Sequence, residues 1–442
     1  MSTTAPNGSP PAAPTAAQVR YILLLLFLIN FLNFFDRILP AVVFEPIRIE
    51  FELTDTQIGL IGTAFTVLYA LVGLPLGRLA DRVSRPRLLG AGVFVWSLMT
   101  AASAYAWNFM SFLLARLGVG VGEASCAPAA NSLIGDLVPP ASRARAFGFY
   151  MLGLPLGNLA CYLLVGWMAF HWGWRMPFLL AAVPGILLAL LLWRLKDAPR
   201  GLQDPQLPGH VERPFGQLLC IPTLWWIIAS GAGVNFAAYA LASFLPSLLI
   251  RYHHLDVAEA GGIAAIVMGA TGLVGLTVGG WLADVVHQRQ VRGRLLLGAV
   301  AMLAAAPLLW LGLDQPAGAV STLTWFLSGA WLLYFLYYVT VYPALQDVVQ
   351  PRLRATAMAV YFCFQYILGA GFGSTVTGAL SDHYAHAEMR LAGLDTMAPA
   401  FRALGLKDAM VVLLPAAMLL TGLALLGAAW TYLRDRDRLR GA

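Results

Sequence analysis

Long uncharged stretches of apolar residues recur along almost the whole 442-residue chain. A hydrocarbon core of about 30 Å is crossed by a helix of about 20 mostly apolar residues. Charged residues make up 11% of the sequence, against about 25% in soluble globular proteins. The sequence therefore predicts an all-α integral membrane protein with twelve transmembrane helices, at approximately 20–44, 56–80, 86–106, 109–138, 143–170, 175–195, 222–250, 257–285, 291–313, 319–349, 353–381 and 407–433.

Basic residues divide unevenly between the two sides of this predicted array. Most of the 28 Lys and Arg residues fall on the side that holds both ends of the chain. The positive-inside rule then predicts a multi-pass protein with both termini in the cytoplasm. The composition is rich in Ala, Gly and Arg, typical of a bacterial gene, so the expected location is the bacterial inner membrane. The charge asymmetry also explains the formal charge of +6 without a nucleic-acid partner. Six basic residues lie on the opposite side, namely Arg48, Arg175, Arg251, Arg390, Arg402 and Lys407.

A single long polar break, rich in proline, divides the chain into two halves. Six apolar stretches precede this segment, 196–221, and six follow it. The stretch "GRLADRVSRPR" (77–87) aligns with "GWLADVVHQRQVRGR" (280–294) in the second half. Such an internal repeat predicts two pseudo-symmetric six-helix bundles. The expected organisation is a disordered cytoplasmic tail at 1–19, an N-terminal bundle at 20–195, a cytoplasmic linker at 196–221, a C-terminal bundle at 222–433 and a cytoplasmic tail at 434–442.

The repeated loop carries a family resemblance. The Gly-x-Leu-Ala-Asp-Arg-x-x-Arg pattern after the second of twelve helices resembles the signature loop of the major facilitator superfamily. The resemblance implies that Asp81 sits near the positive end of helix 11 and that neighbouring basic residues latch a cytoplasmic gate. The alternative is that these basic residues only set the topology. The residues of the expected gating loop are Gly77, Asp81, Arg82, Arg85, Arg87 and, in the repeat, Asp284.

Four charged residues lie within predicted helices rather than at their ends: Asp36, Arg37, Arg116 and Glu123. A charge at the centre of a membrane helix costs about 2.5–3.5 kcal/mol on insertion scales, so such residues compensate one another or carry function. With a rise of about 1.5 Å per residue, Asp36 is expected level with Arg116, and Arg37 within reach of Glu123. The four charges sum to zero, which favours one compensated cluster between helix 1 and helix 4.

Spacing places further polar groups beside this cluster. Asn30, Asn33 and Arg37 are three and four residues apart and so share a face of helix 1. The alternative to a functional site is an ion-pair cluster that only pins two helices together. Buried ion pairs contribute little net stability, because desolvation offsets their attraction. The functional interpretation is therefore favoured.

Three further stretches narrow the resemblance. "RLGVGVGEASCAPAANSLIGDLVPP" (116–140), "GFYMLGLPLGN" (148–158) and "GWRMPFLLAAVPG" (173–185), together with "NFFDR", resemble the Spinster branch of the superfamily. Spinster-like proteins carry lysolipids and sphingosine-phosphate-type lipids in a proton-dependent way. The resemblance implies proton binding at Asp36 and Glu123, with Arg37 and Arg116 pairing with them and contacting an anionic headgroup. Asn33, on the same face as Arg37, is expected among the substrate and ion-pair residues. Anion:cation symporters share the Asp-Arg and Gly-Glu-Ala elements, so a carrier of small organic anions such as sugar acids stays open.

The C-terminal half offers aromatic and amide side chains instead of charges. Tyr334 and Tyr338 lie on one face of helix 10. The alternatives are simple packing between helices and an amphipathic wall that faces an acyl chain. The expected cavity lining consists of Asn30, Tyr334, Tyr338, Phe364, Gln365, Asn235 and Tyr239.

Together these features predict a secondary transporter that works by alternating access as a monomer. Its expected partners are membrane lipids, protons and an amphipathic anionic small molecule. The sequence contains no Walker-type Gly-Lys-Ser/Thr loop, no nucleophile–base pair and no metal-ligand cluster, so we expect no enzyme activity, catalytic residue, metal or cofactor. A non-transporting lipid scramblase or receptor is the alternative from another class.

Overall fold

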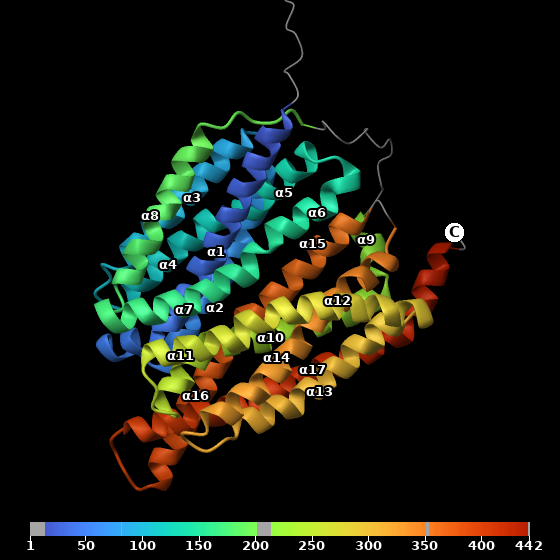
Figure 1. Cartoon of the computed structure of the whole chain (residues 1–442). Helices are drawn as coiled ribbons and strands as arrows, with labels where there is room; N and C mark the ends of the chain where they lie inside the picture. Colours follow the sequence, from blue (N-terminus) through green and yellow to red (C-terminus); the bar gives the residue numbers. More distant parts are fainter. Residues whose placement is uncertain (1–13, 81, 201–213, 351–352, 441–442) are drawn as a thin grey trace, which may run out of the picture.

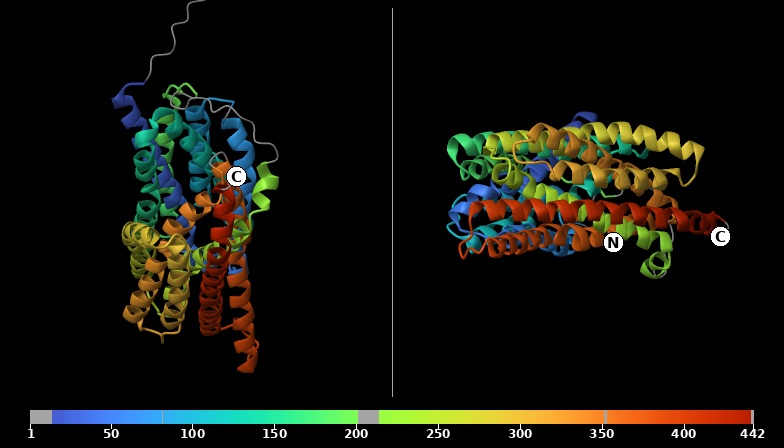
Figure 2. Two further views of the ribbon diagram at one scale, coloured as in Figure 1. Left: turned by 90° about the vertical axis from the view of Figure 1, so that its right-hand side faces the viewer. Right: turned by 90° about the horizontal axis from the view of Figure 1, so that it is seen from below.

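A computed structural model describes residues 14–80, 82–200, 214–350 and 353–440. The described chain is a stack of long helices that form two groups, one blue to green and one yellow to red (Figures 1 and 2). The first group contains α1 (Ala16–Glu50), α2 (Asp55–Ala80), α3 (Arg85–Ser103), α4 (Phe109–Glu123), α5 (Cys126–Leu137), α6 (Pro140–Met151), α7 (Gly153–Trp172) and α8 (Met176–Trp193). The second contains α9 (Pro214–Leu219), α10 (Pro222–Arg251), α11 (Val257–Ala264), η1 (Ala265–Ala270), α12 (Thr271–Arg289), α13 (Gly293–Leu313), α14 (Val320–Asp347), α15 (Arg354–Phe364), η3 (Gln365–Ala370), α16 (Gly371–Leu391) and α17 (Pro399–Arg440).

Eleven helical segments of the described chain are long and apolar enough to cross a membrane. α3, with 19 residues and two arginines in its first turn, is the remaining crossing, because it connects the end of α2 to the opposite end where α4 begins. Several crossings consist of successive pieces, namely α4–α5, α6–α7, α11–η1–α12 and α15–η3–α16. The twelve predicted helices and the two bundles are therefore found, N-terminal (α1–α8) and C-terminal (α10–α17).

Helix ends extend beyond the predicted boundaries. α1 begins at Ala16, inside the predicted tail, because Thr15 and Gln18 form a capping box there. α17 continues to Arg440, so residues 434–440 are helical rather than a separate tail, and α9 lies inside the predicted linker. The end of α17 is mostly charged, and α9 has only 6 residues, so apolar periodicity marks neither of them. The predicted tail at 1–13 and the linker residues 201–213 lie outside the described residues.

Both described ends of the chain lie at the same end of the bundles, which we call the termini side, and the opposite end is the far side (Figure 1). One apolar cluster crosses between the bundles, and it includes Leu39 and Val43 of α1 with Leu245 and Leu248 of α10. A second cluster is built from N-terminal-bundle residues on the termini side, such as Trp96. The bundles therefore share a packed core toward the far side and diverge toward the termini.

Glycines allow the bundles to touch along two seams. A Cβ at Gly59 of α2 would collide with the backbone at Ser374 of α16. A Cβ at Gly166 of α7 would lie 2.9 Å from the Val257 carbonyl oxygen of α11. Small residues let membrane helices approach this closely. The α2–α16 and α7–α11 seams are thus the main lines of contact between the two bundles.

Prolines interrupt α1 and α10 near their far-side ends. α1 contains Pro40 and Pro46, and α10 contains Pro246. A proline inside a helix removes one backbone hydrogen bond and clashes with the preceding turn, so it kinks or weakens the helix. In both helices the proline separates a mid-depth segment from the last turns.

Alanine substitutions should distinguish glycines that pack from those that do not. A Cβ at Gly157 of α7 would meet the Phe31 carbonyl oxygen and, at 3.2 Å, the Phe35 nitrogen of α1, whereas a Cβ at Gly148 of α6 has no atom within 4 Å. We expect Gly157→Ala to lower the thermal unfolding temperature in detergent. Gly148→Ala, the control, should leave it unchanged or raise it, because alanine favours a helix by about 1 kcal/mol over glycine. Equal effects of both variants would contradict the packing role.

Candidate functional site

The four charged residues inside the N-terminal bundle come together between α1 and α4. The Arg37 Nη2 atom donates to Glu123 Oε2 at 2.9 Å, and Arg37 Nε donates to the same oxygen at 3.2 Å. The Glu123 side chain has no exposed surface, and that of Arg37 is 8% exposed. Arg37 Nη2 also lies 3.5 Å from Asn33 Oδ1. The reach from Arg37 to Glu123 is the one that helical depth predicts.

Asp36 and Arg116 meet in a different way. Arg116 Nη2 donates to the backbone carbonyl oxygen of Asp36 at 3.0 Å. The Asp36 carboxylate instead accepts from Thr100 Oγ1 of α3, at 2.6 Å from Oδ2. The two side chains lie level, as predicted, but no hydrogen bond joins the carboxylate to the guanidinium. Thr100 was missed by the sequence analysis, because nothing in the sequence tells which face of α3 turns toward α1.

The cluster keeps unused hydrogen-bonding capacity. Among the described residues, Asp36 Oδ1, Arg116 Nη1 and Glu123 Oε1 are buried and have no hydrogen-bond partner. Buried polar atoms are nearly always paired, so each exception calls for an explanation. An unpaired carboxylate oxygen can take a proton, and an unpaired guanidinium N–H can donate to an anion.

Aromatic rings surround the Arg37 guanidinium. Its carbon atom lies 4.6 Å from the Tyr69 ring centroid, 5.2 Å from that of Phe34 and 5.6 Å from that of Phe65. Rings within about 6 Å attract a cation through their quadrupole. Phe65 and Tyr69 are four residues apart on α2, a spacing from which sequence reasoning could have found them.

Tyr69 also begins an aromatic path to the other bundle. Its ring centroid lies 6.3 Å from that of Tyr366 in η3, and Tyr366 lies 6.4 Å from Tyr239 of α10. Tyr239 is a predicted cavity residue, and this path connects it to the charged cluster. Tyr366 and Tyr69 were not predicted. The interface between the bundles at this depth is therefore aromatic on both sides.

The other predicted cavity residues of the C-terminal bundle form separate contacts with neighbouring side chains. Asn235 Nδ2 donates to Gln365 Oε1 at 3.0 Å, which ties α10 to η3. The Tyr334 and Tyr338 hydroxyls lie 2.5 Å apart on α14. Phe364 packs against Trp225 at 5.9 Å between centroids.

Asn30 of α1 has a hydrogen-bond partner within its own bundle. It donates from Nδ2 to the Tyr150 carbonyl oxygen at 2.9 Å, where α6 passes into α7. In the described conformation it therefore holds α1 against α6.

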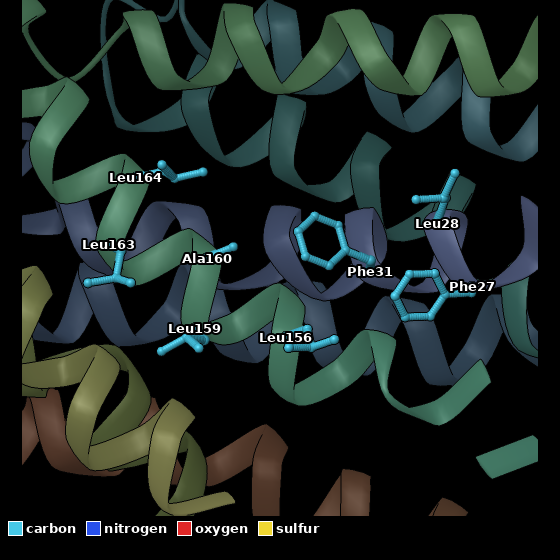
Figure 3. A pocket seen from close by; sticks show the side chains of 8 residues that line it. All are labelled: Phe27, Leu28, Phe31, Leu156, Leu159, Ala160, Leu163 and Leu164. Carbon is cyan, nitrogen blue, oxygen red and sulfur yellow. The ribbon is translucent and has the colours of Figure 1, made fainter. Parts of the chain in front are cut away.

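An apolar groove of about 450 Å³ lies between α1 and α7 (Figure 3). Figure 3 shows side chains from both helices along it, and no charged group is among them. Phe31 in the groove stacks on Phe35, directly before Asp36, with ring centroids 6.4 Å apart. The groove is lined by Phe27, Leu28, Phe31, Leu156, Leu159, Ala160, Leu163 and Leu164.

The predicted gating residues lie on the termini side. Arg85 is fully buried and binds Asp136 and, at 3.0 Å from its Nε, Asp197 Oδ1. These partners belong to its own bundle and the segment after α8, so Arg85 pins the start of α3 in this conformation. Asp284 pairs with Arg294 at 2.7 Å.

The remaining members of that loop have few described contacts. A Cβ at Gly77 would lie 3.9 Å from Pro128 Cβ. Arg82 and Arg87 are exposed, and Asp81 lies outside the described residues. The gating role of the whole loop stays a prediction.

The Arg37–Glu123 pair should be strongly coupled. Removing one partner of a buried ion pair leaves an uncompensated charge and costs about 3–5 kcal/mol, whereas replacing both can be neutral. We expect Arg37→Met and Glu123→Gln each to lower the unfolding temperature in detergent, and the double variant to recover most of the loss. Lys407→Met, which removes the pair with the exposed Asp314, should cost about 1 kcal/mol or less. Additive losses in the double variant would contradict the coupling.

Comparisons with known proteins agree with this architecture. The sequence model of the Major Facilitator Superfamily matches residues 26–374. The chain is 31% identical over 361 residues to an MFS-type efflux pump of Mycolicibacterium smegmatis, covering 81% of this chain and 83% of that protein. It is 27% identical over 373 residues to a hexuronate transporter of Bacillus subtilis, covering 82% and 87%.

A solved structure matches over nearly the whole length. It is the crystal structure of a bacterial homolog to the human lysosomal transporter Spinster, in an inward-facing and unoccupied conformation. The TM-score is 0.81 at 30% identity, and the match covers 96% of this chain and 98% of that one. Fold and family are those of transporters rather than enzymes. The chain therefore belongs to the Major Facilitator Superfamily of membrane transporters and, within it, resembles the Spinster proteins.

Proposed function

We propose that this protein is a proton-coupled secondary transporter of an amphipathic anionic lipid-like substrate, of the lysolipid or sphingosine-phosphate type. The observation that carries the proposal is the buried cluster between α1 and α4. There Asp36 Oδ1 and Arg116 Nη1 lack hydrogen-bond partners among the described residues. A buried acid with a free oxygen beside a buried arginine with a free donor suits both a proton and an anion.

Proton exchange would take place at Asp36 first and at Glu123 second. A carboxylate in a dry site holds its charge only while an arginine compensates it. One Glu123 carboxylate oxygen accepts a hydrogen bond from Arg37. The Asp36 carboxylate accepts its hydrogen bond from the Thr100 hydroxyl instead. A small shift of Arg37 toward a substrate anion would leave Glu123 uncompensated and favour its protonation. Proton and anion binding are thus linked through one guanidinium.

The surroundings favour a substrate with an apolar chain. Arg37 and Arg116 would contact an anionic headgroup, since a guanidinium pairs well with phosphate and carboxylate oxygens. The aromatic path of Tyr69, Tyr366 and Tyr239 lies beside Arg37. The groove between α1 and α7 offers further apolar surface, and its Phe31 stacks on Phe35, the residue before Asp36. The likeness to the bacterial Spinster homolog supports the Spinster resemblance, which implies the same substrate class.

A second candidate is a proton-coupled carrier of small organic anions such as sugar acids. The likeness to the hexuronate transporter favours it, and two buried arginines would serve a carboxylate as well as a phosphate. A non-transporting lipid scramblase or receptor would need no proton site. The apolar groove favours the lipid-like substrate, because a sugar acid has no apolar chain to place along it.

The proposed setting follows from the charge distribution. The termini side would face the cytoplasm of a bacterial cell, in accordance with the positive-inside rule. The protein would work as a monomer in the inner membrane by alternating access, with the charged cluster exposed to each side in turn. Protons and membrane lipids would be its partners, and no cofactor would be needed.

Proton coupling is tested by flux under an imposed pH gradient. We expect Asp36→Asn in proteoliposomes to abolish pH-driven flux, because an amide cannot exchange a proton. The control is Asp314→Asn, which removes a half-exposed carboxylate at the far end of α13 and should leave the flux unchanged. An unchanged pH-driven flux in Asp36→Asn would overturn proton coupling at this residue.

The substrate class is tested by thermal stabilisation with lysolipids, sphingoid phosphates and sugar acids. A ligand at 100 times its dissociation constant stabilises the folded state by about 2.7 kcal/mol. We expect stabilisation by lysolipids or sphingoid phosphates, and its loss in Arg116→Gln, because that substitution removes the charge that contacts the headgroup. Stabilisation by sugar acids alone would select the organic-anion carrier.

A further inference from the structure

A second set of buried charges lies on the far side, away from the proposed transport site. Arg251, the last residue of α10, donates from Nε to Glu45 Oε2 of α1 at 2.5 Å and from Nη1 to Asp55 Oδ2 of α2 at 2.8 Å. The side chains of all three residues are at most 5% exposed. One cation of the C-terminal bundle thus bridges two acids of the N-terminal bundle. Arg48 of α1 adds a second cation, 2.6 Å from Glu45 Oε1.

An acid from the C-terminal bundle caps a helix of the N-terminal bundle at the same place. The Asp382 carboxylate of α16 accepts from the backbone N–H groups of Asp55 at 3.0 Å and Thr56 at 2.8 Å, the first residues of α2. It also accepts from Thr56 Oγ1 at 2.6 Å. The N-terminus of a helix has unpaired N–H groups and a partial positive charge, which favour a carboxylate. α2 therefore receives its cap from the other bundle.

The surrounding contacts run between the same two bundles. Ser381 Oγ of α16 donates to Asp55 Oδ2 at 2.7 Å. A Cβ at Gly378 would collide with the backbone at Asp55, so α16 and the start of α2 are in direct contact. About two turns deeper, the hydroxyls of Thr63 and Thr375 lie 2.6 Å apart. The charges thus close the far-side end of the α2–α16 seam.

We propose that Arg251, Glu45, Asp55 and Asp382 form a far-side latch, which holds this side closed in the described conformation and comes apart when the transporter opens toward it. The reason is geometric. Contacts within one bundle survive a rigid-body rotation of the bundles, whereas contacts between them must break and form again. The latch rests on the proposed alternating access, and it is independent of the substrate and of proton coupling.

The chemistry of these residues suits a contact that opens repeatedly. A buried ion pair adds little net stability, because the desolvation of the charges offsets their attraction. On opening, water solvates the separated charges again, so the open state is not strongly disfavoured. Substitution of Arg251 should destabilise the closed state, because Glu45 and Asp55 would stay buried there without the cation that they share. The closed far side should then become the unfavourable state.

The latch is tested by distances between spin labels in the reconstituted protein. The four native cysteines, at 126, 161, 220 and 363, are replaced by serine. A far-side pair is introduced with Tyr105→Cys and Ala317→Cys, and a termini-side pair with Lys196→Cys and Gln290→Cys. All four positions are exposed, and each pair has one member in or next to each bundle. Double electron–electron resonance then reports the opening of each side without substrate.

We expect Arg251→Ala to shift the far-side pair to longer distances and the termini-side pair to shorter ones, with the open-to-closed ratio changed by at least about tenfold. Asp382→Asn, which keeps the shape and removes the charge, should shift both pairs in the same direction by less. Arg175→Ala is the matched control. This far-side arginine pairs with Glu50 at 2.6 Å inside one bundle, so its loss should leave both distributions unchanged.

Unchanged distributions in both Arg251→Ala and Asp382→Asn would overturn the latch, as would an equal shift in Arg175→Ala. If Arg251→Ala fails to fold, Arg251→Lys and Asp382→Asn decide the question by the same distances. Failure of proton-driven lipid transport together with an intact latch response would overturn the proposed function and leave the latch standing. The two proposals therefore fail separately.

Discussion

The compensation of buried charge is the constraint on which the rest of this structure depends. A lone charge in the hydrocarbon region is expensive, so Arg37 and Glu123 fix how α1 and α4 lie against each other. α3 joins them through Thr100, which holds the Asp36 carboxylate. α2 contributes the aromatic rings that face the Arg37 guanidinium. The packing of the four helices around this cluster is thereby set by electrostatics as much as by apolar contact.

The far-side latch also compensates buried charge, but its residues come from both bundles. In the cluster between α1 and α4 all four charges belong to one bundle. In the latch the cations and acids come from both bundles, and the helix end of α2 takes up the Asp382 charge. Charges that compensate one another within one bundle can bind and release a proton or an anion while the fold stays intact. Ion pairs that join the two bundles, as in the latch, break or form only when the bundles move.

The sequence predicted those features that depend on helical periodicity alone. The twelve helices follow from apolar length, and the contact of Arg37 with Glu123 follows from the fixed rise per residue. The Thr100 contact and the bond from Arg116 to the Asp36 backbone depend on the rotation of each helix and on side-chain rotamers, which no local pattern encodes. The pairing of Arg251 with Glu45 joins residues 206 positions apart. Both charges lie near a helix end, where charges are ordinary, so the sequence did not mark either one as a site residue.

The prolines of α1 and α10 lie between the mid-membrane segments and the latch residues of these helices. In α1, Pro40 stands between Arg37 and the latch residue Glu45, and in α10, Pro246 stands between Tyr239 and the latch residue Arg251. A helix bends most easily where a proline has removed a backbone hydrogen bond. Each latch residue is thus separated from the mid-membrane segment of its helix by a turn that lacks one backbone hydrogen bond. We therefore expect the last turns of α1 and α10 to yield more easily than the segments around the charged cluster.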